Sequence, residues 1–222
     1  DIWPQLKGQT SLFCETFNAA TAAEKCDLIF LAVPHTVSMT ITPELLHKGL
    51  KVIDLSGDYR LTSAAVYKKW YGKKHADSRR LSKAVYGLPE LYRAKIKTAP
   101  LIANPGCYPT AAILGLAPLV SLQSKGIDSI IIDAKSGVTG AGKKTTSSLM
   151  FSEVNENLKA YKLFRHQHTP EIEQYLSALA GAKVTLTFTP HLIPINCGIY
   201  ETIYVQLNKQ FKASDLHPSY KK

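Results

Sequence analysis

The sequence is poor in cysteine, and its cysteines form no pairing motif. The four are spread along the chain without a CxxC spacing: Cys14, Cys26, Cys107 and Cys197. Zinc ribbons need closely spaced cysteine pairs, and small disulfide scaffolds need a high density of cysteine. Both classes are excluded, and we expect a protein that works in a reducing compartment.

A membrane-directing segment is also lacking. Residues 1–4 carry neither the basic nor the apolar part of a secretory signal. The uncharged stretch at residues 98–124 is long enough to span a bilayer, but four prolines and Asn104 interrupt it. A buried strand followed by a buried helix explains this stretch better. We therefore expect a soluble, cytoplasmic protein without a membrane partner.

Acidic residues are scarce, since 17 of them stand against 27 lysines and arginines, which gives a net charge of +10. The basic residues are scattered, and aromatic residues do not alternate with them as in proteins that stack single-stranded nucleic acid. We therefore expect no nucleic-acid partner. The charge fits either a solvated, lysine-rich surface or the attraction of small anionic ligands, such as phosphorylated ones.

The first half of the chain shows the alternation of a parallel, doubly wound α/β sheet. Short apolar runs predict buried strands at residues 27–33, 51–55 and 101–103. Helices are expected between them, at residues 38–48 and 62–71. Loops follow the strands at residues 34–35, 56–60 and 104–107. Ligands bind beyond the carboxyl ends of such strands, so these loops are expected to converge on one site.

The pattern changes after residue 107. Helices are expected at residues 109–121, 146–155 and 170–180, and strands at residues 127–133, 183–189 and 199–207. The last two strands alternate apolar and polar residues, as half-exposed strands do. This order predicts an α+β domain with a mixed sheet. We therefore place one domain at residues 1–106 and a second at residues 107–222.

Cys107 stands at the junction of the two domains, in the run Asn-Pro-Gly-Cys-Tyr-Pro-Thr. Gly106 permits a sharp turn, and Pro109 suits the first turn of a helix. The sulfur is expected at a helix N-terminus, where partial positive charge lowers the pKa of a thiol. A buried structural cysteine is the ordinary alternative. The turn and the strand-end position favour a covalent nucleophile that acts on an activated acyl group.

Two histidines, His166 and His168, precede a predicted helix start. Thr169 is typical of an N-cap, and Pro170 of a first helical position. The histidines are expected in extended chain and on the same side, where one can serve as a general acid or base. Surface histidines or a metal pair are the alternatives. A metal site needs a third ligand, and no spacing in the sequence supplies it, so we expect no metal.

A glycine-rich loop and one arginine complete the candidates. Residues 136–142 hold three glycines and two hydroxyls between Lys135 and Lys143, so backbone N–H groups could cradle a phosphate there. An ordinary flexible turn explains this loop equally well, because the spacing of a Walker loop is not met. Arg60 could bind a carboxylate or phosphate with two hydrogen bonds. Taken singly, it is better explained by a salt bridge with Asp58 or another neighbour.

Seven motifs, in this order along the chain, resemble those of the N-acetyl-γ-glutamyl-phosphate reductase family, a relative of aspartate-semialdehyde dehydrogenase. They are Pro-His at 34–35, Leu-Ser-Gly-Asp-Tyr-Arg-Leu at 55–61, Tyr-Gly-Leu-Pro-Glu at 86–90, Pro-Gly-Cys-Tyr-Pro-Thr at 105–110, Ser-Gly-Val-Thr-Gly-Ala-Gly at 136–142, His-Gln-His-Thr-Pro-Glu-Ile at 166–172 and Phe-Thr-Pro-His-Leu at 188–192. The resemblance implies a Rossmann-like NADP-binding domain at residues 1–106, without its first strand–helix unit. It also implies a catalytic and dimerisation domain at residues 107–222, truncated at its C-terminal end.

The same resemblance implies a chemistry and its residues. The Cys107 thiolate displaces phosphate from N-acetyl-γ-glutamyl phosphate, and the thioester is reduced with NADPH to the semialdehyde, a step of arginine biosynthesis. His168 is the implied acid/base, and His166 is the alternative for that role. Substrate contacts are implied for Arg60, His166 and Glu171. Cofactor contacts are implied for Pro34, His35, Ser136, Gly137 and Gly140. A homo-oligomer, dimer or tetramer, is expected.

Three alternatives stay open. A sister reductase of lysine biosynthesis acts on a carrier-bound or longer acyl phosphate. A cysteine–histidine hydrolase needs no nicotinamide cofactor, and a catalytically silent fragment folds without turning over a substrate. The chain also departs from the family pattern at Cys197, where arginine is expected and where cysteine cannot replace the charge.

Overall fold

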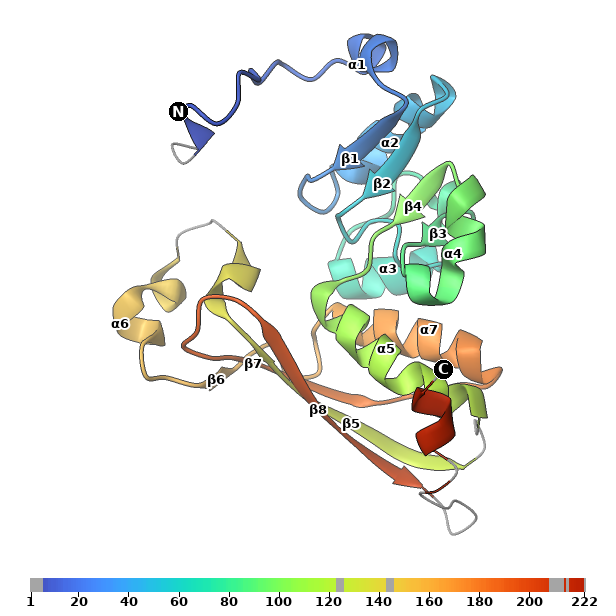
Figure 1. Ribbon diagram of the computed structural model, residues 1–222, viewed down its shortest axis with the longest axis vertical. Helices are drawn as coiled ribbons and strands as arrows, with labels where there is room; N and C mark the ends of the chain where they lie inside the picture. Colours follow the sequence, from blue (N-terminus) through green and yellow to red (C-terminus); the bar gives the residue numbers. More distant parts are fainter. Residues whose placement is uncertain (1–5, 123–125, 143–145, 208–213, 215, 222) are drawn as a thin grey trace.

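The structure is a computed structural model that describes residues 6–122, 126–142, 146–207, 214 and 216–221. It contains two separate β-sheets, one in each half of the chain (Figure 1). Two helices of the second half lie between the sheets in this view. The strand-end loops of the first sheet therefore face the second half of the chain.

The first sheet is parallel throughout, with the strand order β1-β2-β4-β3. Its strands are β1 (Leu28–Leu31), β2 (Lys51–Asp54), β3 (Val85–Tyr86) and β4 (Leu101–Ala103). The helices of this half are α1 (Ala19–Lys25), α2 (Ser38–His47), α3 (Ala64–Tyr71) and α4 (Pro89–Thr98). The predicted Rossmann-like parallel sheet is confirmed. The burial expected for its strands is only partly confirmed, because Val52 of β2 and Leu101 of β4 are buried, whereas Leu28 and Phe30 of the edge strand β1 are exposed.

Two α-helices and one strand described in this half were not predicted from the sequence: α1, α4 and β3. Helix α1 had a visible signal, because the Asn18 side chain accepts hydrogen bonds from the first-turn N–H groups of Ala20 and Thr21. Helix α4 begins at Pro89, a residue suited to a first helical position. Strand β3 is only two residues long and pairs with β4, so no periodicity marks it in the sequence.

The second sheet is mixed, as predicted, with the strand order β6-β7-β5-β8. Its strands are β5 (Ile127–Ser136), β6 (Lys159–Ala160), β7 (Thr187–Leu192) and β8 (Ile199–Leu207). Strands β5 and β7 are parallel, whereas β8 and β6 run antiparallel to their neighbours. The helices are α5 (Cys107–Leu122), α6 (Phe151–Val154) and α7 (His168–Ala180).

Two predicted elements of this half differ from the structure. The helix expected at residues 146–155 is reduced to the 3-10 turn η4 (Ser147–Leu149) and the short α6, because Met150 between them has an extended backbone. The strand expected at residues 183–189 lies further along, as β7. Pro190 is within β7, where its missing N–H is tolerated more readily because β6 pairs with only two residues of that edge.

Helices α5 and α7 pack together on one face of the second sheet and form its core. Side chains of α5, such as Ile113 and Leu116, join Ile132 of β5 and Leu176 of α7 in one buried cluster. Helix α5 carries the uncharged stretch of the sequence, and this burial explains its apolar composition. None of the helices in the described part of the chain is long and apolar enough to cross a membrane.

We predict that Leu116→Ala lowers the free energy of unfolding by about 2–5 kcal/mol, because it removes a fully packed side chain and leaves a cavity. Leu122 is a matched control on the same helix, since its side chain is 48% exposed whereas Leu116 is 2% exposed. Leu122→Ala is expected to cost about 0.5 kcal/mol. Urea denaturation measures both values, and equal losses would contradict this description of the core.

Glu201 is an unusual residue of the same sheet. It lies on β8 opposite Ala134 of β5, and neither of its carboxylate oxygens has a hydrogen-bond partner among the described residues. Burial raises the pKa of this carboxyl from 4.5 to about 8. The folded protein therefore keeps a proton on Glu201 at pH values where the unfolded chain has lost it.

This pKa shift predicts a pH dependence of stability. Because the folded state binds more protons than the unfolded state between about pH 4.5 and pH 8, Glu201 makes the protein less stable as the pH rises through that window. Between pH 5 and pH 8, the free energy of unfolding of Glu201→Gln is expected to fall by about 3 kcal/mol less than that of the parent. Denaturation at both pH values measures it, with the exposed Glu24→Gln as the control. Parallel stability profiles for parent and Glu201→Gln would refute it.

Candidate active site

The loops after β1 and β2 are joined by Asp58. Its carboxylate accepts hydrogen bonds from the Thr36 N–H at 2.8 Å and from the Tyr67 hydroxyl at 2.6 Å. His35 is fixed in the same way, because its Nδ1 accepts the Gly57 N–H at 2.8 Å. The expected convergence of the strand-end loops is confirmed. Since His35 accepts through Nδ1, its neutral ring carries the proton on Nε2.

Arg60 is buried and binds the loops around it. Its Nε donates to the Asn104 carbonyl at 2.7 Å, and a terminal nitrogen donates to the Leu55 carbonyl at 3.0 Å. Its other terminal nitrogen lies 3.7 Å from Oε2 of Glu171. Arg60 therefore forms its ion pair with Glu171, whereas the Asp58 carboxylate accepts a backbone hydrogen bond from the neighbouring loop. In this position Arg60 ties the loop before Cys107 to helix α7.

Glu171 holds the turn that presents the cysteine. This residue is fully buried in α7, and its Oε1 accepts the Gly106 N–H and the Tyr86 hydroxyl, both at 2.8 Å. Burial raises the pKa of Glu171, while Arg60 and the two hydrogen bonds oppose that rise. Sequence reasoning named Glu171 only through the family resemblance, because no local pattern reveals a partner 65 residues away.

Cys107 is the first residue of α5, so the prediction of a cysteine at a helix N-terminus is confirmed. Its side chain is exposed to solvent. The predicted lowering of its pKa is wrong. Burial by the surrounding walls raises the pKa of the thiol, although backbone N–H groups of the first turn and Arg60 act in the opposite direction. Desolvation of the thiolate outweighs the helix terminus here.

His166 and His168 lie side by side, with ring centroids 4.6 Å apart. They are not in extended chain before the helix, as predicted, because α7 already begins at His168. Thr169 is consequently inside the helix rather than its N-cap. The His166 ring supplies a local bond instead, since its Nδ1 accepts the His168 N–H at 3.2 Å. Pro170 remains in the first turn, where its missing N–H is tolerated.

The His168 ring packs against the turn before Cys107. A methyl group placed on Gly106 would lie only 2.5 Å from Nε2 of His168, so the approach of the ring requires glycine there. Nδ1 of His168 is buried without a hydrogen-bond partner in the described part of the chain. The catalytic candidates thus meet at one point, where α5 and α7 begin.

Both histidines are neutral at physiological pH. Burial, together with the charge of Lys162, lowers the pKa of His166 to about 4. The pKa of His168 is well below its usual value, first through burial and then through His166 and Arg60. A neutral ring is the form that accepts a proton. The pair is therefore in the state that a general base requires.

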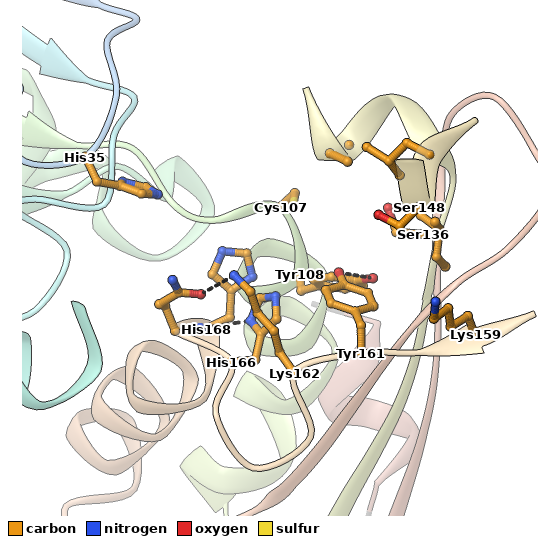
Figure 2. A pocket seen from close by; sticks show the side chains of 15 residues that line it. His35, Cys107, Tyr108, Ser136, Ser148, Lys159, Tyr161, Lys162, His166 and His168 are labelled. Atoms are coloured by element: carbon orange, nitrogen blue, oxygen red, sulfur yellow. Dashed lines mark hydrogen bonds between the residues drawn. The ribbon is translucent and has the colours of Figure 1, made fainter. Parts of the chain in front are cut away.

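These residues line a cavity of about 610 Å³. Six of the predicted site residues lie on its wall: His35, Cys107, Ser136, Gly140, His166 and His168. Figure 2 shows the Cys107 sulfur in the space between His35 on one side and Ser136 on the other. Gly137 borders an adjacent hollow that also includes Cys107. Pro34, Arg60 and Glu171 are not on either wall.

The glycine-rich loop is held by the turn between β7 and β8. The N–H groups of residues 137–139 donate to the carbonyls of Gly198, Ile195 and Asn196. Those of Gly140 and Gly142 donate within the loop. These groups are therefore not free to cradle a phosphate, and the loop serves as a wall of the cavity. Lys143 lies outside the described residues. No group of three or more metal-binding side chains occurs in the described ranges.

Sequence reasoning missed several of the lining residues, among them Tyr108, Lys159, Tyr161 and Lys162. The Tyr161 hydroxyl donates to the Tyr108 hydroxyl at 3.2 Å, which joins the segment after β6 to the first turn of α5. A Lys-Ala-Tyr-Lys run marks this segment at residues 159–162, a few positions before the two histidines. A run of four such residues is too short to indicate a binding site from the sequence alone.

Two family models cover most of the chain. The model described as semialdehyde dehydrogenase, dimerisation domain, matches residues 107–222, and the model described as semialdehyde dehydrogenase, NAD binding domain, matches residues 1–99. The N-acetyl-gamma-glutamyl-phosphate reductase of Desulfotalea psychrophila is 51% identical over 221 residues, which are 99% of this chain and 64% of that protein. The one from Geobacillus thermodenitrificans is 52% identical over 200 residues, 90% of this chain and 58% of that protein. The chain spans less than two thirds of the length of these relatives.

Solved structures show the same fold at low sequence identity. Aspartate semialdehyde dehydrogenase II from Vibrio cholerae has a TM-score of 0.62 at 14% identity, covering 90% of this chain and 61% of that one. The Candida albicans aspartate semialdehyde dehydrogenase crystallised with NADP has a TM-score of 0.58 at 14% identity, covering 88% of this chain and 55% of that one. The two-sheet architecture is thus that of the semialdehyde dehydrogenases.

We predict that Glu171→Gln lowers the free energy of unfolding by about 3 kcal/mol, because it leaves the buried Arg60 charge without its partner. It is also expected to change the alkylation rate of Cys107 by iodoacetamide, since the Gly106 turn loses a charged acceptor. Glu173→Gln is the control, because Glu173 lies on the same helix but, among the residues that the structure describes, accepts a hydrogen bond only from the Leu186 N–H. If both variants alkylate at the parent rate, Glu171 does not position the cysteine.

Proposed function

The chain belongs to the semialdehyde dehydrogenase family, and on that basis we propose that its protein reduces N-acetyl-γ-glutamyl phosphate to N-acetylglutamate semialdehyde with NADPH, in arginine biosynthesis. One observation carries the proposal: an exposed Cys107 at the start of α5 shares a cavity with the neutral His168 at the start of α7. The names of relatives at 51% and 52% identity support the choice of substrate. The domains proposed are residues 1–106 and 107–222.

Residues of the cavity suit the nicotinamide end of the cofactor. When bound, NADPH supplies the hydride that reduces the thioester carbon. We propose that Pro34 and His35 hold one side of the ring and that residues 136, 137 and 140 hold the other. A methyl group on Gly140 would lie 2.9 Å from the Ser136 Oγ, so glycine leaves this wall open beside a polar hydroxyl. A flat, polar-edged ring fits such a wall.

In the proposed chemistry, His168 accepts the proton of the Cys107 thiol. The raised pKa of the thiol and the lowered pKa of the imidazole both oppose a thiolate–imidazolium pair in the resting protein. Proton removal must therefore accompany attack of sulfur on the acyl carbon. The new C–S bond replaces the C–O bond to phosphate, which leaves with its electron pair. His168 then returns its proton when the C–S bond breaks and the semialdehyde departs.

Arg60 and Glu171 act on this reaction through the turn that they hold. The family resemblance implies substrate contacts for both, but the structure engages Arg60 with two carbonyls and Glu171 with Gly106 and Tyr86. We therefore propose that they position Cys107. His166 remains the candidate for a direct substrate contact, because it lies on the cavity wall.

A homodimer is part of the proposal. The family model that matches residues 107–222 is described as a dimerisation domain. The face of the second sheet away from α5 and α7 exposes large side chains of adjacent strands, including Ile131 of β5 and its pairing partner Tyr204 of β8. A second copy on this mixed face would remove these exposed apolar side chains from water, beside the Lys135–Asp133 ion pair.

The proposed reaction is tested in reverse, with the semialdehyde, inorganic phosphate and NADP supplied and NADPH formation followed spectrophotometrically. We predict that Cys107→Ala abolishes NADPH formation, whereas Cys26→Ala, at an exposed cysteine in the cap of α1, keeps the parent rate. His168→Asn is expected to lower the rate by about 10²–10⁴ and to change its pH profile.

Each rival function gives a different result in this assay. An unchanged rate for Cys107→Ala would refute the thioester mechanism. Turnover without NADP(H) would favour a cysteine–histidine hydrolase, and activity only with longer acyl substrates would favour the lysine-pathway reductase. Absence of any turnover in the intact protein would favour a protein that folds but is catalytically silent.

A further inference from the structure

The charged side chains on the wall of the cavity around Cys107 are all positive among the described residues. Two lysines, Lys159 and Lys162, lie on its wall, and no carboxylate does so in the described part of the chain. The histidines add no charge, because their pKa values are lowered. The cavity therefore has a positive potential that its own walls do not neutralise.

Neither lysine is paired with an acid. Nζ of Lys162 donates to the amide oxygen of Gln167 at 3.1 Å, a neutral partner. Lys159 has no carboxylate within 4 Å among the described residues. Surface lysines that only solubilise a protein have no need of a fixed position. Here the backbone position is fixed by Tyr161, one of the two residues between them.

Tyr161 fastens this segment to the rest of the molecule. Its N–H donates to the Pro190 carbonyl of β7 at 3.1 Å, and its hydroxyl donates to Tyr108 beside the nucleophile. Lys159 pairs with Leu192 in the β6–β7 ladder. Figure 2 shows the two lysines on either side of Tyr161, with Lys162 next to the histidines and Lys159 towards Ser136 and Ser148.

Lys162 has a strained backbone. Its φ of +47° lies in the left-handed region, which costs a residue with a side chain about 1–2 kcal/mol. Glycine or asparagine would remove that cost, so the sequence retains a lysine where local stability disfavours it. Strain of this kind is typical of positions where a side chain is directed at a ligand.

We propose that Lys159 and Lys162 form the subsite for the phosphoryl group of the acyl phosphate, and for the inorganic phosphate that it releases. This inference rests on the proposed function. The phosphoryl oxygen is bonded to the carbon that Cys107 attacks, so the group must lie in the same cavity as the sulfur. A dianion requires two cationic partners, and ammonium groups on both sides of Tyr161 meet that requirement.

Such a subsite would act on the leaving group. Charge accumulates on the departing phosphate as the C–O bond breaks, and two ammonium groups stabilise it there. The carboxylate of the substrate lies further from the reacting carbon, and the cofactor phosphates belong to the opposite end of the nicotinamide. We therefore assign the lysines to the phosphoryl group rather than to these other anions.

Inorganic phosphate is the probe. In the intact protein, phosphate should protect Cys107 from iodoacetamide, followed by mass spectrometry of the peptide that contains it. We expect Lys159→Gln and Lys162→Asn each to raise the half-protecting phosphate concentration about tenfold, the loss of one charge-assisted hydrogen bond. Asparagine is chosen because it tolerates the left-handed backbone of residue 162. Lys159→Arg should protect nearly as well as the parent.

Lys97→Gln, on the exposed face of α4, is the matched control and should bind phosphate like the parent. Parent-like protection in the Lys159→Gln, Lys162→Asn double variant would overturn the proposal. So would a double variant that raises KM for the semialdehyde or for NADP while phosphate protection stays unchanged. Because protection needs no turnover, phosphate binding lost in the variants supports the subsite even if the reductase assay fails, and the two proposals fail separately.

Discussion

The carboxylate of Glu171 is the point on which the rest of the site depends. It enters from α7, accepts the Gly106 N–H just before the nucleophile, and faces the guanidinium of Arg60. Arg60 in turn binds the carbonyl of Asn104, the first residue after β4. One buried ion pair thus joins the first sheet, the start of α5 and the start of α7. Removing either charge would leave the other buried and unpaired, so the arrangement persists only as a whole.

This construction has a consequence for reactivity. The walls that hold Cys107 and His168 in place also desolvate both groups, and desolvation is the largest cause of the shift in each pKa, raising that of Cys107 and lowering that of His168. The resting site is therefore neutral, with thiol and imidazole rather than thiolate and imidazolium. A free thiolate would be more open to oxidation and alkylation than the neutral thiol of the resting site.

Those parts of this site that depend on interactions between near neighbours in the chain could be predicted from the sequence. A short apolar strand, a glycine turn and a proline in the first helical turn place Cys107 with little ambiguity. The start of α7 was misplaced by two residues, because a side-chain bond from His166 replaces the expected threonine cap. The partners of Arg60 and Glu171 could not be derived, since each depends on which of many buried groups approaches across the folded chain. The predicted direction of the Cys107 pKa shift was wrong for the same reason. The helix terminus can be inferred from the local sequence, whereas burial of the thiol depends on the whole fold.

Lys162 gives one of the chain's many positive charges a specific role. Its ammonium group helps to lower the pKa values of His166 and His168 in the empty cavity. An anionic phosphoryl group beside it would offset that charge and so raise the basicity of His168 at the moment when the Cys107 proton must be accepted. When phosphate leaves, the lysine again favours the neutral ring, and the proton is returned more readily. The charge that binds the leaving group would thus also time the proton transfer, because both depend on the same electrostatic potential in one cavity.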